Sequence, residues 1–139
     1  MKILFYKAKF GTWLDKLISA VTFSKFSHCE LQFSDGVCGT SSIRDGGVRL
    51  KSIKVIPDHW DIFDVTTEHK ESVIRYWFQT YSEEKYDTIG AICSAFGFNP
   101  ALNNDKWFCS EVCGLFTCGK NDLSPGALYK HLIKTGKIC

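Results

Sequence analysis

The strongest alternation of apolar and polar residues along the chain lies at residues 27–33. Side chains of successive strand residues point to opposite faces of a sheet, so this pattern predicts a strand with one apolar and one polar face. The apolar face would hold Cys29, Leu31 and Phe33, and the polar face His28, Glu30 and Gln32.

Four further strands are predicted, at residues 2–6, 37–42, 48–53 and 61–65. The turn-forming runs Ser34-Asp35-Gly36 and Asp45-Gly46-Gly47 separate three consecutive strands by short connections. Short connections between neighbouring strands favour an antiparallel meander.

Helical spacing of apolar residues predicts a helix at 12–21, capped by Thr12, and others at 67–81 and 86–96. The first would bury the face formed by Trp13, Leu14, Leu17, Ile18 and Val21. Gly97 and the Asn99-Pro100 turn would end the helix at 86–96, and Ser124-Pro125 would open a last helix through Leu128, Leu132 and Ile133. We therefore expect an α+β fold in which a small antiparallel sheet packs against helices, as a single domain over residues 1–139.

Composition excludes several classes of protein. The hydrophobic fraction of 45% and charged fraction of 23% are those of a globular domain, and the net charge is only +2. The basic residues gather loosely, chiefly at Arg44, Arg49, Lys51 and Lys54, so we expect no nucleic-acid partner. The longest apolar segment, residues 89–98, is about half of the ~20 residues that a transmembrane helix needs. No transmembrane segment is expected, although peripheral membrane contact remains open.

The seven cysteines are an odd number without a CxxC pair, which fits neither a disulfide framework nor a zinc site. The apolar run at residues 3–6 is interrupted by Lys7 and Lys9 and is too short for a signal peptide. Free thiols and no export signal predict a cytoplasmic protein.

Cys109 is the first candidate for chemistry because it opens a predicted apolar helix after a polar loop. A thiol at a helix N-terminus feels the positive end of the helix dipole, which favours the thiolate. Cys109 could equally be one more small buried core residue.

His28 and Glu30 are the next candidates, since they share the polar face of the strand at 27–33. A carboxylate two residues away lies about 7 Å along a strand, within reach of an imidazole directly or through a water. The alternative is an ordinary solvent-exposed polar face.

The remaining candidates are weaker. Cys113 and Cys118 match no zinc spacing, and three isolated histidines have no partner in the pattern: His59, His69 and His131. Tyr86-Asp87 and Trp107 could line a cleft or belong to the core, and residues 45–47 lack the lysine-bearing helix start of a phosphate loop. We expect no metal and no cofactor.

Four sequence blocks resemble the circularly permuted NlpC/P60 (papain-like) cysteine hydrolases, a group that includes YiiX-like and YebB-like proteins with poxvirus and small phage relatives. The blocks are residues 26–31, 34–36, 45–49 and 107–111. As in the permuted enzymes, the histidine strand comes before the cysteine helix, and the likeness extends from Phe26 to the helix start at Ser124.

The resemblance implies that Cys109 is the nucleophile, His28 the general base, and a third polar residue the group that orients the ring. Glu30 is the preferred third residue, with Thr40 and Ser41 on the neighbouring strand as alternatives. It further implies a peptide, amide or acyl-ester substrate and a covalent acyl-enzyme. A non-catalytic protein that sequesters a host factor on the same scaffold is the rival interpretation.

Overall fold

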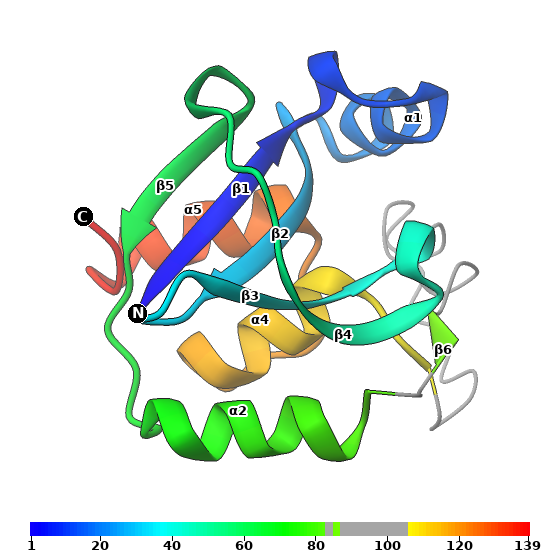
Figure 1. The fold of residues 1–139 in the computed structure, drawn as a ribbon. Coiled ribbons are helices and arrows are strands. Elements are labelled where there is room, and N and C mark those ends of the chain that lie inside the picture. Colours follow the sequence, from blue (N-terminus) through cyan, green and yellow to red (C-terminus); the bar gives the residue numbers. More distant parts are fainter. Residues whose placement is uncertain (83–84, 87–105) are drawn as a thin grey trace.

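The computed structural model describes residues 1–82, 85–86 and 106–139 (Figure 1). Its helices are α1 (Trp13–Thr22), α2 (Glu71–Thr80), α4 (Cys109–Cys118) and α5 (Pro125–Lys134). Its long strands are β1 (Lys2–Lys7), β2 (Phe26–Gln32), β3 (Val37–Ser42), β4 (Gly47–Ser52) and β5 (Trp60–Asp64), and the two-residue strands are β6 (Lys85–Tyr86) and β7 (Lys106–Trp107).

The strands form one sheet in the order β5-β1-β2-β3-β4-β6-β7. The five long strands pair antiparallel, and β6 and β7 pair parallel. The α+β class and the meander β2-β3-β4 are thus confirmed. Strand β2, which carries His28, lies inside the sheet between β1 and β3.

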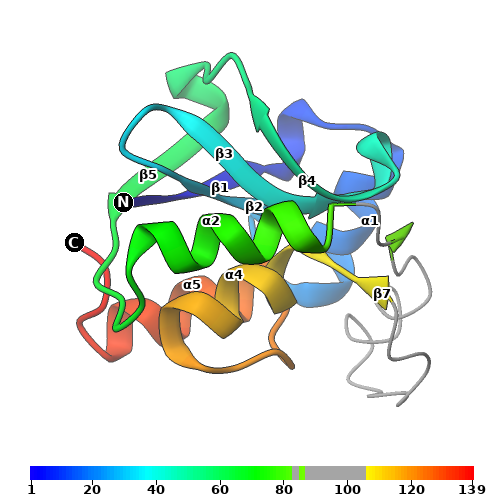
Figure 2. The same ribbon diagram turned by 60° about the horizontal axis from the view of Figure 1, so that its bottom comes forward.

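Helices α2, α4 and α5 cover one face of this sheet (Figures 1 and 2). The apolar face of β2 packs on α4 and α5, and its residues Cys29, Leu31 and Phe33 are almost fully buried, as predicted. Helix α2 adds Ile74 and Phe78 to the same core. The core therefore lies between β2 and the helix that begins at Cys109.

Predicted and observed boundaries of the strands agree within about one residue, but two helices differ. Helix α2 begins at Glu71 instead of residue 67 because the Thr67 hydroxyl donates to the Phe116 carbonyl and accepts from the His69 N–H. These hydrogen bonds connect residue 67 to α4 and keep it outside helix α2. Tyr86 lies in β6, so the predicted helix start there is wrong, and the rest of the helix at 86–96 falls outside the described residues.

Only part of the predicted apolar face of helix α1 turns toward the protein. Leu14, Ile18 and Val21 are partly buried. Trp13 and Leu17, expected in the core, are 75% and 41% exposed, and the only fully buried residue of the helix is Asp15. A polar contact at Asp15 therefore helps to hold the helix.

That contact is the Asp15 carboxylate, which accepts hydrogen bonds from the Thr12 N–H at 2.7 Å and the Ser27 hydroxyl at 2.8 Å. Arg44 pairs with it at 2.8 Å. A Cβ on Gly11 would come within 2.4 Å of the Asp15 carboxylate, so the chain approaches this group closely at a glycine. The network joins α1 to β2 beside His28.

Replacing Asp15 with alanine should lower the free energy of unfolding by about 2 kcal/mol, because Ser27 and Thr12 lose their acceptor. Burial opposes ionisation of Asp15, but the hydrogen bonds from Thr12 and Ser27, with Arg44 nearby, lower its pKa below the usual value. A lowered pKa stabilises the fold above the unfolded-state pKa, and this stabilisation disappears as pH falls through the folded-state pKa. Urea denaturation of Asp15→Ala at neutral and acid pH measures both effects. Asp64→Ala, at an exposed ion pair with Lys2, is the matched control; an equal effect of both changes would contradict the assignment.

Candidate active site

Strand β2 brings His28 and Glu30 together, as the alternation predicted. The His28 Nε2 atom lies 3.1 Å from Glu30 Oε1, a direct hydrogen bond without an intervening water. The face that carries them is not an open polar surface, however, since Glu30 is 2% exposed. A buried carboxylate requires a partner for its charge.

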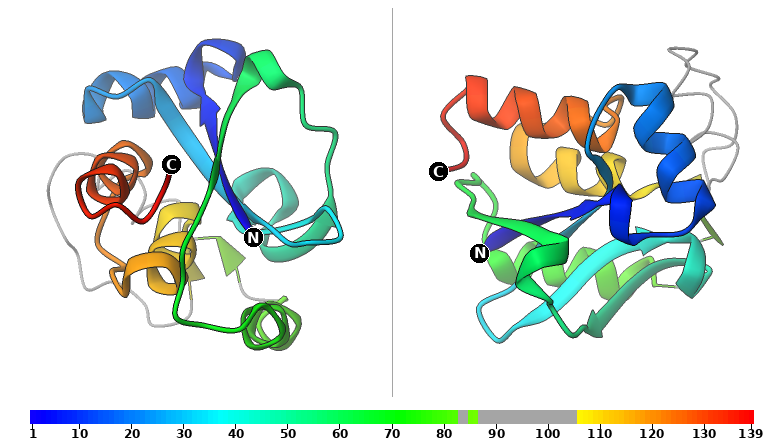
Figure 3. Two further views of the ribbon diagram at one scale, coloured as in Figure 1. Left: turned by 90° about the vertical axis from the view of Figure 1, so that its left-hand side faces the viewer. Right: turned by 90° about the horizontal axis from the view of Figure 1, so that it is seen from above.

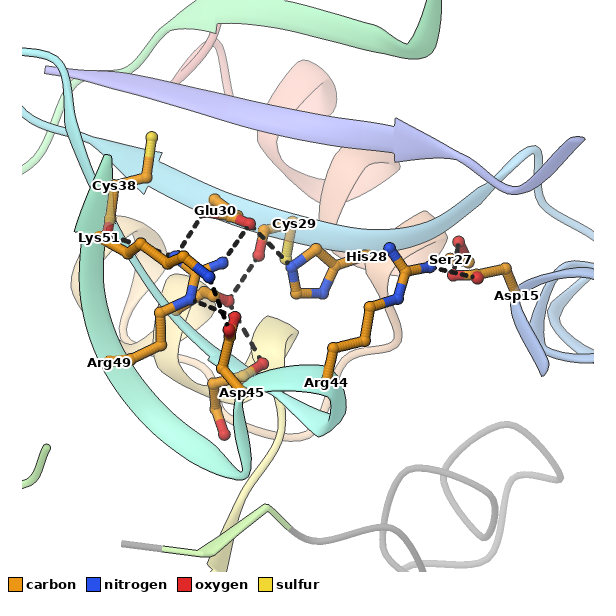
Figure 4. Close-up of polar contacts among 12 residues, drawn as sticks. Asp15, Ser27, His28, Cys29, Glu30, Cys38, Arg44, Asp45, Arg49 and Lys51 are labelled. Atoms are coloured by element: carbon orange, nitrogen blue, oxygen red, sulfur yellow. Dashed lines mark hydrogen bonds and ion pairs between the residues drawn. The ribbon is translucent and has the colours of Figure 1, made fainter. Parts of the chain in front are cut away.

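Arg49 of β4 supplies that partner (Figure 4). Its guanidinium donates to both oxygens of Glu30, at 2.9 and 2.8 Å, in a bidentate pair. Asp45 accepts from Arg49 Nε at 2.7 Å and from Lys51 Nζ at 3.0 Å. Glu30 is therefore held in place by Arg49, which is itself held by Asp45.

The pKa of Glu30 reflects these contacts. Burial raises it, but hydrogen bonding and attraction from His28, followed by those from Arg49, outweigh burial and leave the pKa below its usual value. Glu30 is thus a carboxylate at neutral pH, fit to orient and stabilise a charged imidazole.

Cys109 is the first residue of α4, as predicted. The Glu111 side chain accepts a hydrogen bond from the Phe108 N–H at 3.1 Å and so fixes the start of the helix. Hydrogen bonding from Cys29 lowers the pKa of the Cys109 thiol, and after the opposing effect of burial, attraction and hydrogen bonding from His28 lower it further. The pKa of Cys109 ends well below its usual range.

His28 shows the reciprocal effect. Burial lowers its pKa, but attraction and hydrogen bonding from Cys109, and then from Glu30, raise it to about 10. Since Nε2 contacts Glu30, Nδ1 is the ring nitrogen left for the thiol. The opposite pKa directions of the two groups, each caused in part by the other, favour a thiolate–imidazolium pair between Cys109 and His28 at neutral pH.

Cys29, predicted from the sequence only as a core residue, also lies next to Cys109. Burial raises its pKa well above the usual value, and hydrogen bonding with Cys109 and Cys113 raises it further. Cys29 therefore stays protonated and can donate its S–H to the Cys109 thiolate. Two features of the sequence could have indicated that Cys29 lies next to Cys109. Cys29 directly follows His28, and Cys109 and Cys113 are spaced i, i+4 on one helix face.

Thr40 and Ser41, the alternatives to Glu30, serve the backbone instead of the ring. The Thr40 hydroxyl donates to the Cys29 carbonyl at 2.7 Å, and the Ser41 hydroxyl donates to the Trp107 carbonyl at 2.6 Å. Among the contacts described for the chain, only Glu30 of these three residues bonds to His28. Thr40 and Ser41 tie β3 to β2 and to the residues just before Cys109.

A cavity of about 360 Å³ opens beside the histidine. Polar and charged residues, His28, Glu30 and Arg49 among them, make up most of its lining. Apolar residues from α1 and from the segments flanking β4 line the remainder, including Leu14, Ile18, Ile43, Ile53 and Ile56. Cys109, which is 2% exposed, is not among the residues that line this cavity. The cavity thus gives access to the imidazole and its carboxylate.

The weaker candidates have other contacts. His59 stacks on Phe10 with ring centroids 4.1 Å apart, and His69 packs edge-on against Phe116. In the described ranges, no group of three or more His, Cys, Asp or Glu side chains is arranged to hold a metal ion. No helix there is long and apolar enough to cross a bilayer.

Comparison with models of protein families, with curated proteins and with solved structures gives no match. The resemblance to the permuted NlpC/P60 enzymes therefore rests on the four sequence blocks alone.

Proposed function

We propose that the protein is a cysteine hydrolase or acyltransferase with a permuted papain-like fold, acting on an amide, peptide or acyl ester. The observation that carries the proposal is the pairing of Cys109, at the start of α4, with a His28 ring that Glu30 holds. A thiolate next to an imidazolium is the arrangement that nucleophilic cysteine catalysis requires. The histidine strand precedes the cysteine helix, as in the permuted NlpC/P60 group.

In this mechanism the Cys109 thiolate attacks the substrate carbonyl carbon. Backbone N–H groups in the first turn of α4 stabilise the resulting oxyanion. The His28 imidazolium donates its proton to the leaving group, which leaves an acyl-thioester on Cys109. His28, now neutral, takes a proton from water or another acceptor as that group attacks the thioester, so the acyl group is released and the thiolate–imidazolium pair is restored.

Three further features support the proposal. The described cysteines are all free thiols, which suits a reducing, cytoplasmic location. The Arg49–Asp45 contacts fix Glu30 in place beside the His28 ring. The cavity beside His28 has both polar and apolar lining residues, which fits the polar scissile bond and the apolar part of an acyl or peptide group.

Cys109 should be alkylated by limiting iodoacetamide before the other cysteines, and at pH about 6, where an ordinary thiol carries little thiolate. Cys139 is exposed and provides the internal comparison for accessibility. Mass spectrometry of the labelled peptides gives the order of reaction. Labelling that follows exposure, with Cys139 first and Cys109 spared in the native protein, would exclude an activated nucleophile.

The second candidate is a non-catalytic binding protein on the same scaffold, which sequesters a host factor. The burial of Cys109, and its absence from the residues lining the described cavity, favour it. The two candidates differ in one measurable respect: an acyl-donor probe should form a thioester on Cys109 only in an enzyme. Intact-mass analysis after exposure to such a probe separates them.

A further inference from the structure

The outward face of α1 carries large apolar side chains that lie open to solvent. Trp13 is 75% exposed and Leu17, one turn later, is 41% exposed. Phe23, the residue that caps the helix, is 91% exposed. Lys16 and Ala20 lie between them on the same face and are also exposed. We call this set, Trp13, Lys16, Leu17, Ala20 and Phe23, the α1 outer surface.

Two local features show that core packing does not account for these side chains. Asp15 holds the inward side of α1 through polar contacts, so the helix is attached without burying Trp13. Phe23 has a φ of 48°, a left-handed conformation that is usually taken by glycine at the end of a helix. Trp13 and Phe23 therefore lie outward without contributing to core packing.

The segment that contains this surface is rich in positive charge. Residues 7–25 contain four lysines and one acid, Asp15, whose charge is matched by Arg44. Lys7 and Lys25 both pair with Asp61, at 2.8 and 2.7 Å, so two positive charges share one carboxylate. An occupant of this surface should carry negative charge beside apolar groups.

We propose that α1 docks the protein onto an anionic lipid surface. The helix lies at the outside of the molecule (Figure 3). A helix face that carries tryptophan, leucine and phenylalanine together with Lys16 fits the boundary between headgroups and acyl chains. Tryptophan in particular favours that boundary.

Docking in this orientation would bring the cavity next to the lipid. The inward side of α1 contributes Leu14 and Ile18 to the cavity that His28 also lines. A helix is about 10 Å across, so lipid bound on the outer surface would lie within roughly that distance of the cavity wall. Docking itself does not depend on the Cys109 chemistry.

The test is co-sedimentation of the full chain with vesicles of phosphatidylcholine mixed with phosphatidylserine, against vesicles of phosphatidylcholine alone. We expect binding to the mixed vesicles that weakens at high salt. Trp13→Ser with Leu17→Ser should reduce partitioning by about tenfold or more. Lys16→Gln should reduce it roughly fivefold on the anionic vesicles only.

The matched control is Val73→Ser with Tyr76→Ser, which removes side chains of α2 that are 54% and 71% exposed. This variant should bind vesicles as the wild type does, and so should Cys109→Ala, whatever the outcome for the enzyme proposal. Equal binding by the α1 double variant and the wild type would overturn the proposal. A lipid-free dimer that Trp13→Ser converts to a monomer would also overturn it, because α1 would then be an interface between copies.

Discussion

His28→Ala should slow acylation of Cys109 by about 10²–10⁴-fold, the usual contribution of a general acid–base group. The variant loses both the positive charge that stabilises the Cys109 thiolate and the proton for the leaving group. Since attraction to His28 helps to lower the pKa of Cys109, that pKa should rise in the variant and move the alkylation profile to higher pH. In the wild type, acyl transfer should decline as pH rises through the His28 pKa of about 10.

His59→Ala is the matched control for this change, because His59 lines the same cavity but stacks on Phe10. It should acylate at close to the wild-type rate. Rates of Cys109 acylation and alkylation against pH, with circular dichroism to verify folding, provide the measurement. A wild-type rate in folded His28→Ala would refute the Cys109–His28 pair.

Glu30→Gln should have two effects, one on stability and one on chemistry. In this variant Arg49, whose side chain is 13% exposed, keeps its ion pair with Asp45 but loses the bidentate ion pair with residue 30. The free energy of unfolding should fall by about 2–3 kcal/mol, somewhat less than for a buried charge left without any partner. The pKa of His28 should also fall, because hydrogen bonding and attraction from Glu30 help to raise it.

The stability effect has a defined pH dependence. The pKa of Glu30 is lowered in the folded state from its usual 4.5, so its contribution to stability is fully present above pH 4.5. As pH falls through the folded-state pKa, the contribution is lost, and wild type and Glu30→Gln should converge in stability. Urea denaturation at neutral pH and at about pH 3 measures this convergence.

Thr40→Val tests whether Thr40, instead of Glu30, orients the His28 ring. It removes a hydroxyl that donates to the Cys29 carbonyl, so it should reduce stability by about 1 kcal/mol and leave the pH profile of acylation unchanged. If Thr40→Val shifts that profile and Glu30→Gln does not, the orienting role of Glu30 is wrong, although the pairing of Cys109 with His28 would remain.

Much of the fold could be predicted from local pattern. Alternation at residues 27–33 located β2 and put His28 beside Glu30, and turn residues such as Gly36, with a φ of 85°, marked the strand boundaries. The start of α4 at Cys109 also followed from spacing. These features depend on neighbours in sequence, which periodicity describes well.

The features that could not be predicted depend on contacts between distant segments. Hydrophobic spacing predicted helix α1 correctly but only part of its inward side, because the buried residue of the helix is Asp15, which bonds to Ser27 of β2. The role of Arg49 depends on the order of β2, β3 and β4 in the sheet, which sets the distance between Arg49 and Glu30. The contact of Cys29 with Cys109 depends on the packing of α4 on β2, which the alternation within β2 does not indicate.

The order of these elements along the chain has a consequence for synthesis. The five long strands end at Asp64, whereas α4 and α5, which cover their apolar face, come from residues 109–134. A nascent chain that has emerged only as far as the strands holds His28 but has no thiolate for it to pair with. Under the proposed function, the pairing of Cys109 with His28 can therefore form only after α4 has been made, and the reaction of Cys109 at mildly acid pH can report that α4 has packed on the strands.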